Sequence, residues 1–194
     1  MRAFFCIPIP SWLRGTLVET AKQFCAQTKA RASWVPKQNY HVTLRFLGDI
    51  DRELLLHLDK LCRAVCKDVE PFECIIDRVG AFPSDDRARV IWEGGEAPLT
   101  FHRLSRALFE GLVNLGFPEV RKESLVHVTL ARIKGRPDPT LPGLMSELNP
   151  LSALTMTVDR VVLMESMLTS QGAEYAPLFT ARLGGTGNDA DRVA

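Results

Sequence analysis

The tetrapeptide His-Val-Thr-Leu stands at residues 41–44 and again at residues 127–130, so the two copies lie 86 positions apart in a chain of 194 residues. The chain has four histidines, and the two copies use half of them. Val, Leu, Thr and aromatic residues surround both copies, and this composition favours β-strands. We therefore predict strands over residues 40–47 and 125–133, and we interpret the repeat as evidence of a duplicated fold.

Alternation along a strand places the polar residues of each copy on one face. Because successive side chains point to opposite faces, the His and Thr of each copy share one face, and the Val and Leu point to the core. The exposed polar residues are then His41, Thr43, His127 and Thr129. The same two-residue count places Arg45 beside the first pair, where we expect it to bind substrate. A strand pair whose imidazoles and hydroxyls only bond to one another is the alternative.

Positive charge gathers around both copies, although the whole chain carries a net charge of only +1. Residues 28–48 contain four basic residues and no acid, and residues 121–136 contain five basic residues and one acid. Clustering on a solvated surface is the simplest explanation of such a window. Next to a repeated His–Thr pair, however, a basic window indicates an anionic ligand.

Two histidines and two threonines suit chemistry at a phosphodiester. One group must take a proton from the attacking oxygen and another must give one to the leaving oxygen; imidazole can do both, because its ordinary pKa is about 6.5. Threonine hydroxyls and an arginine can hold the non-bridging oxygens. The chain has no Walker-type glycine loop, no zincin helix and no obvious carboxylate cluster near either histidine. We therefore expect no metal and no cofactor.

The overall composition is that of a globular protein, with 46% hydrophobic and 24% charged residues. No apolar run approaches the roughly 18 residues of a membrane span, so we expect no membrane association. Pro8 and Pro10 interrupt the apolar N-terminal stretch, which argues against a secretory signal and favours a cytoplasmic protein. The five cysteines are expected to be reduced and mostly buried; Cys62 and Cys66 could share a metal, but no further ligand is apparent.

These features together resemble the two-histidine phosphoesterase superfamily and, within it, the LigT-like RNA 2′,3′-cyclic phosphodiesterases, also called 2′-5′ RNA ligases. The resemblance covers nearly the whole chain. Besides the two tetrapeptides it rests on residues 2–8, 34–36, 45–48, 89–92, 161–166 and 175–178, and on Arg132.

The resemblance implies an enzyme that hydrolyses a terminal 2′,3′-cyclic phosphate to a 2′-phosphate without a metal, together with 2′-5′ RNA ligase activity. It implies that His127 is the proton acceptor and His41 the proton donor. It also implies that Thr43, Thr129 and Arg132 grip the phosphate. The expected partners are RNA or oligonucleotides with a 2′,3′-cyclic phosphate end, and cyclic nucleotides.

Some residues have more than one possible role. Phe46, Trp34 and Trp92 could stack on a nucleobase or pack in the core, and we take Phe46 as the substrate-binding candidate. His57 and His102 lie in helical segments and are expected to be solvated or to pack, without a catalytic role. Two other functions stay open: a phosphodiesterase for a small cyclic nucleotide such as ADP-ribose 1″,2″-cyclic phosphate, and a non-catalytic RNA-binding module.

The predicted fold is α+β: a duplicated bilobal fold of two antiparallel-sheet and helix halves, with the active-site cleft between them. We expect one two-lobed domain over residues 1–183, a disordered tail over 184–194, and a monomer. Hydrophobic periodicity predicts helices over 11–29, 54–67 and 99–115, and strands over 2–8, 72–76, 88–92, 154–166 and 174–182. It also predicts a turn at Gly94-Gly95 and a proline-rich loop over 135–143.

Overall fold

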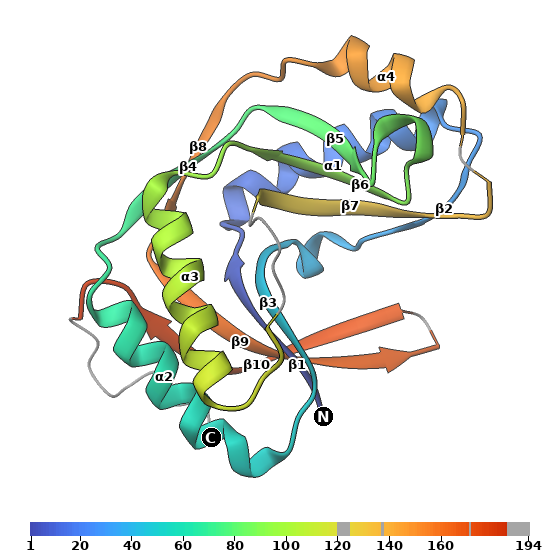
Figure 1. The fold of residues 1–194 in the computed structure, drawn as a ribbon. Coiled ribbons are helices and arrows are strands. Elements are labelled where there is room, and N and C mark those ends of the chain that lie inside the picture. Colours follow the sequence, from blue (N-terminus) through green and yellow to red (C-terminus); the bar gives the residue numbers. More distant parts are fainter. Residues whose placement is uncertain (120–124, 137, 171, 186–194) are drawn as a thin grey trace.

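Strands that carry or flank the repeated tetrapeptides form one continuous antiparallel sheet (Figure 1). The computed structural model describes residues 1–119, 125–136, 138–170 and 172–185. Its strands are β1 (Arg2–Pro8), β2 (Arg31–Trp34), β3 (His41–Asp49), β4 (Phe72–Ile76), β5 (Arg78–Phe82), β6 (Val90–Gly95), β7 (Val126–Lys134), β8 (Leu154–Val158), β9 (Arg160–Thr169) and β10 (Gly172–Arg182). The strand order is β10-β9-β1-β3-β7-β6-β5, β2 pairs with β7, and β4 and β8 form a separate two-stranded sheet.

Four α-helices within the described residues cover this sheet: α1 (Ser11–Gln27), α2 (Leu55–Lys67), α3 (Leu99–Asn114) and α4 (Leu141–Leu148). Helices α1 and α4 lie against β5, β6 and β7, and α2 and α3 lie against the other lobe (Figure 1). In α1 the buried residues Leu13, Leu17 and Phe24 recur at helical spacing, as predicted. Trp12, in the first turn of the same helix, is 57% exposed.

Among the residues that the structure describes, one residue pair connects the two lobes of the sheet. Val42 of β3 pairs with Val128 of β7, and these valines hold the same place in the two tetrapeptides. A two-fold axis that relates the two lobes would pair equivalent residues in this antiparallel way. Away from this pair β3 continues beside β1, and β7 continues beside β6 and β2. The predicted α+β fold with two lobes related by duplication is confirmed.

The apolar residues of both tetrapeptides belong to the core, as predicted. Val42, Val128 and Leu130 are fully buried and Leu44 is 9% exposed. Burial of one such side chain contributes about 1.5–3 kcal/mol, so the four residues hold β3 and β7 firmly against the helices. A second core cluster fills the space between α1, α4 and β5–β7.

The structure differs from the sequence prediction at several elements. Strands β2 and β5 and helix α4 were not predicted, and Leu141 already begins α4 inside the expected loop 135–143. Gly94 and Gly95 end strand β6 and do not form a turn. A Cβ at either position would collide with the carbonyl oxygen of Val126 or Ile75, so these glycines mark a close approach of backbones.

Some predictions fall on residues outside the described part of the chain. These include residues 121–123 of the second basic window, residue 137 of the expected loop and residues 186–194 of the expected tail, so the tail stays a prediction. In the described residues, none of the helices has both the length and the apolar character of a membrane span. The cysteines are free thiols, buried except for Cys25.

Candidate active site

A β-bulge in β3 decides which side chains lie beside His41. The register between β1 and β3 moves by one residue between Thr43 and Arg45, which leaves Leu44 unpaired. The extra residue reverses the alternation, so Arg45 pairs with Phe5 and shares the face of that fully buried side chain. The prediction that Arg45 shares the face of His41 and Thr43 is therefore wrong.

Arg45 instead holds the end of α3. Its guanidinium donates a hydrogen bond to the carbonyl of Pro118 (2.6 Å) and lies 5.3 Å from the centre of the Phe109 ring. Both partners lie on or just after α3. The contacts indicate packing between β3 and α3, and a substrate-binding role for Arg45 stays a prediction that this placement does not favour.

Phe46 takes the place that was expected for Arg45. It pairs with Phe4, with 5.7 Å between the ring centres, and the Phe4 ring is 4.7 Å from the His41 ring. Phe46 is 61% exposed. Of the three aromatic candidates, Trp34 packs against both core clusters and Trp92 is 8% exposed. Phe46 is thus the candidate with a free ring face.

Strand β7 contains the same bulge at the equivalent residue. The register between β6 and β7 moves by one between Thr129 and Ala131, which leaves Leu130 unpaired. Ala131 is fully buried, and Arg132 is exposed on the face of His127 and Thr129. We call the side of the sheet that carries the following residues the histidine face: His41, Thr43 and Phe46 from β3, and His127, Thr129 and Arg132 from β7.

Both imidazoles are held by the same backbone contact. The Nδ1 of His41 is 2.7 Å from the carbonyl oxygen of Asn39, and the Nδ1 of His127 is 3.1 Å from that of Leu125. Each carbonyl belongs to the residue two positions before its histidine. A carbonyl can only accept, so each Nδ1 carries the hydrogen, and each Nε2 is left to accept or deliver a proton. The Nε2 of His41 lies 3.1 Å from the Thr43 hydroxyl.

The surroundings of His41 keep its imidazole neutral in the free protein. Burial lowers the pKa of His41 to about 4, and the charges of His127 and Arg132 also lower it, whereas the hydrogen bond to Asn39 raises it. Groups from both lobes thus lie close enough for their charges to interact. A phosphate anion bound beside His41 would raise its pKa, because an opposite charge favours the protonated form.

Several known proteins are similar to this chain in sequence. The sequence model of the family described as LigT like Phosphoesterase matches residues 7–92 and 96–175. This chain belongs to the LigT-like phosphoesterase family. A relative from Methanothermobacter thermautotrophicus is 35% identical over 94% of this chain and 99% of its own length, and one from Aeropyrum pernix is 32% identical over 84% and 92%. Both relatives are named RNA 2′,3′-cyclic phosphodiesterase.

Solved structures have the same fold. A crystal structure of a protein from Thermus thermophilus superposes with a TM-score of 0.79 at 26% identity, over 96% of this chain and 100% of the other. The crystal structure of E. coli LigT complexed with 3′-AMP superposes with a TM-score of 0.75 at 23% identity, over 94% and 97%. The matches span both lobes, so the resemblance inferred from the tetrapeptides is confirmed.

Aromatic rings from other strands hold the imidazoles of this LigT-like phosphoesterase. Tyr175 of β10 meets His41 almost at a right angle, with 5.3 Å between ring centres. Phe82 of β5 meets His127 in the same way at 5.0 Å. Such edge contacts restrict the tilt of each imidazole. Sequence reasoning assigned no role to either aromatic residue, because no local pattern connects them to a histidine so distant along the chain.

The other two histidines of this phosphoesterase lie elsewhere. His57 on α2 and His102 on α3 are exposed. Within the described ranges, no three side chains of His, Cys, Asp or Glu gather closely enough to hold a metal ion. The histidine face thus carries two imidazoles and two threonine hydroxyls as candidates for proton transfer and phosphate binding.

Proposed function

We propose that this LigT-like phosphoesterase hydrolyses the terminal 2′,3′-cyclic phosphate of RNA to a 2′-phosphate without a metal. The observation that carries the proposal is the paired arrangement of His41 and His127. Each imidazole has its Nδ1 tied to the carbonyl two residues earlier, and the two lie on one face, on either side of the Val42–Val128 pair. An in-line reaction at phosphorus needs two proton-transfer groups on opposite sides of one phosphate, and the two-fold arrangement of the imidazoles supports this role.

In the proposed reaction, His127 accepts a proton from water as the water oxygen attacks phosphorus. The bond from phosphorus to the 3′ oxygen breaks, and His41 gives that oxygen a proton. Because the pKa of His41 is about 4 in the free protein, binding of the anionic substrate must first favour its protonated form. An RNA 5′-hydroxyl in place of water would form a 2′-5′ linkage by the same steps.

Thr43, Thr129 and Arg132 are proposed to hold the non-bridging oxygens. All three lie on the histidine face, and hydroxyl and guanidinium donors fixed there would stabilise the charge that develops in the transition state. Phe46 is proposed to stack on the terminal base. The names of the relatives support RNA as the substrate class.

We also propose one two-lobed domain over residues 1–183 that acts as a cytoplasmic monomer. Both histidines and both threonines come from one chain, so a single copy carries every group that the proposed reaction uses.

The test is incubation with a cyclic-phosphate-ended oligonucleotide, with each 2′,3′-cyclic nucleotide and with ADP-ribose 1″,2″-cyclic phosphate, all in EDTA. We expect the 2′-phosphate from the RNA-type substrates, identified by chromatography against authentic 2′- and 3′-phosphates. Turnover of the ADP-ribose compound alone would support a small-nucleotide enzyme. Salt-sensitive RNA binding without turnover would support a binding module.

A further inference from the structure

Three basic side chains extend the histidine face away from the histidines. In the register of β2 and β7, Arg132 pairs with Ser33, and Lys134 pairs with Arg31. Residues two apart on a strand, and residues directly opposite in a pair, lie on the same face of a sheet. Arg31 and Lys134 therefore lie on the histidine face with Arg132. We call Arg132, Lys134 and Arg31 the basic strip.

The core on the other side of the sheet fixes this orientation. Ala131 and Ile133, which alternate with the basic residues of β7, are buried in one core cluster with Phe24 of α1 and residues of α4. Asp138 is 4% exposed and accepts hydrogen bonds from the backbone amides of Lys29 and Ala30 just before β2. These hydrogen bonds from backbone donors to the carboxylate hold the start of β2 in place.

The pair of Arg31 and Lys134 is unfavourable by itself. Like charges directly opposite in an antiparallel pair destabilise a sheet. Both side chains are exposed, and neither forms an ion pair or a side-chain hydrogen bond with any other described residue. A bound anion would remove this repulsion.

The distance of the Arg31–Lys134 pair from Arg132 indicates which anion the pair binds. Residues two apart on a strand are about 6.8 Å apart, a spacing that suits consecutive phosphates of an extended single strand. If Arg132 holds the reacting phosphate, Lys134 and Arg31 lie one nucleotide further along. Resting on the proposed function, we propose that Arg31 and Lys134 bind the phosphodiester that joins the terminal nucleotide to the rest of the RNA.

This site makes the enzyme prefer an oligonucleotide to a mononucleotide. The test compares kcat/KM for three substrates: a nucleoside 2′,3′-cyclic phosphate, the same nucleotide carrying a 5′-phosphate, and a short oligonucleotide ending in the cyclic phosphate. The 5′-phosphorylated nucleotide supplies the proposed phosphate without a second base. We expect it to recover most of the advantage of the oligonucleotide over the unphosphorylated nucleotide.

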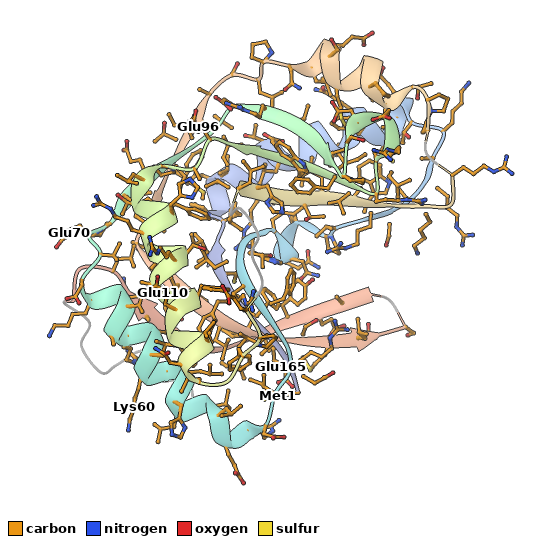
Figure 2. The ribbon with its side chains drawn as sticks, in the orientation of Figure 1. Met1, Lys60, Glu70, Glu96, Glu110 and Glu165 are labelled. Carbon is orange, nitrogen blue, oxygen red and sulfur yellow. The ribbon has the colours of Figure 1, made fainter. Side chains whose placement is uncertain are left out.

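The double variant Arg31→Gln with Lys134→Gln should reduce the ratio of kcat/KM between oligonucleotide and unphosphorylated nucleotide by about tenfold. The dependence of log kcat/KM on log salt should also flatten by about 0.7 for each phosphate that the variant no longer neutralises. The matched control is Lys60→Gln. Lys60 is an exposed lysine on α2, at the opposite end of the molecule from β2 and β7 (Figure 2).

Removal of the like charges should leave the midpoint of thermal unfolding unchanged or raise it, which separates a binding effect from misfolding. Equal losses on all three substrates, or no change in the ratio, would overturn the proposed phosphodiester site while leaving the proposed function intact. If the unmodified enzyme turns over none of the three, the proposed function fails instead.

Discussion

The lowered pKa of His41 makes the stability of the protein depend on pH. In the unfolded chain the imidazole has a pKa of about 6.5, and burial lowers it to about 4 in the folded protein. The unfolded state therefore binds an extra proton between these two values. Stability is retained above about pH 6.5 and is lost as the pH falls toward 4. A histidine that gains a carboxylate partner on folding would have the opposite pH dependence, because its stabilising effect is lost as the pH rises.

The size of the effect follows from the two pKa values. Between about pH 7 and about pH 5, the free energy of unfolding should fall by about 2 kcal/mol through His41 alone. Urea unfolding at the two pH values measures this change. The variant His41→Asn removes the titrating group, so its unfolding free energy should fall by about 2 kcal/mol less over the same interval.

The matched control is His57→Asn, because His57 is exposed on α2 and its substitution should leave the pH dependence of the native protein intact. If the native protein and His41→Asn lose the same free energy between the two pH values, His41 is not held neutral by burial. The electrostatic description of the histidine face would then be wrong.

Three further predictions concern activity. His41→Ala or His127→Ala should lower kcat about 10²–10⁴-fold in a folded protein, because each substitution removes one proton transfer. The control His57→Ala should leave kcat nearly unchanged. Equal losses of kcat in all three variants would contradict the assigned pair. The pH profile of kcat, measured in EDTA, should be bell-shaped, because one imidazole must be neutral and the other charged. A kcat that rises steadily from about pH 5 to about pH 9 would instead favour attack by hydroxide without a general base. Phe46→Ala should raise KM about tenfold by loss of base stacking. Arg45→Ala should lower the unfolding free energy by about 1–2 kcal/mol with little change in KM. A rise in KM for Arg45→Ala, with none for Phe46→Ala, would return Arg45 to the binding site.

The local sequence pattern was sufficient to predict the elements in which polar and apolar residues recur with a regular period. The strands around both tetrapeptides, the burial of Val42 and Val128, and the common face of each His–Thr pair all follow from the two-residue period of a strand. This period is a property of the backbone itself. Helices α1, α2 and α3 were predictable for the same kind of reason. The identity of the two tetrapeptides also indicated the duplication, because a repeat can be recognised without knowledge of contacts.

Tertiary structure decided what lies next to the histidines. The bulges at Leu44 and Leu130 depend on pairing with β1 and β6, so a count along the sequence misplaced Arg45 and could not place Phe46. Short elements such as β2 and α4 are stable only against neighbours that are distant in sequence, and periodicity over so few residues carries little signal. The sequence by itself thus determined which residues are candidates for the chemistry, because side-chain type and strand period are local. Which charges and aromatic rings surround them depended on non-local strand pairing, since a shift of one residue in register moves a side chain to the other face of the sheet.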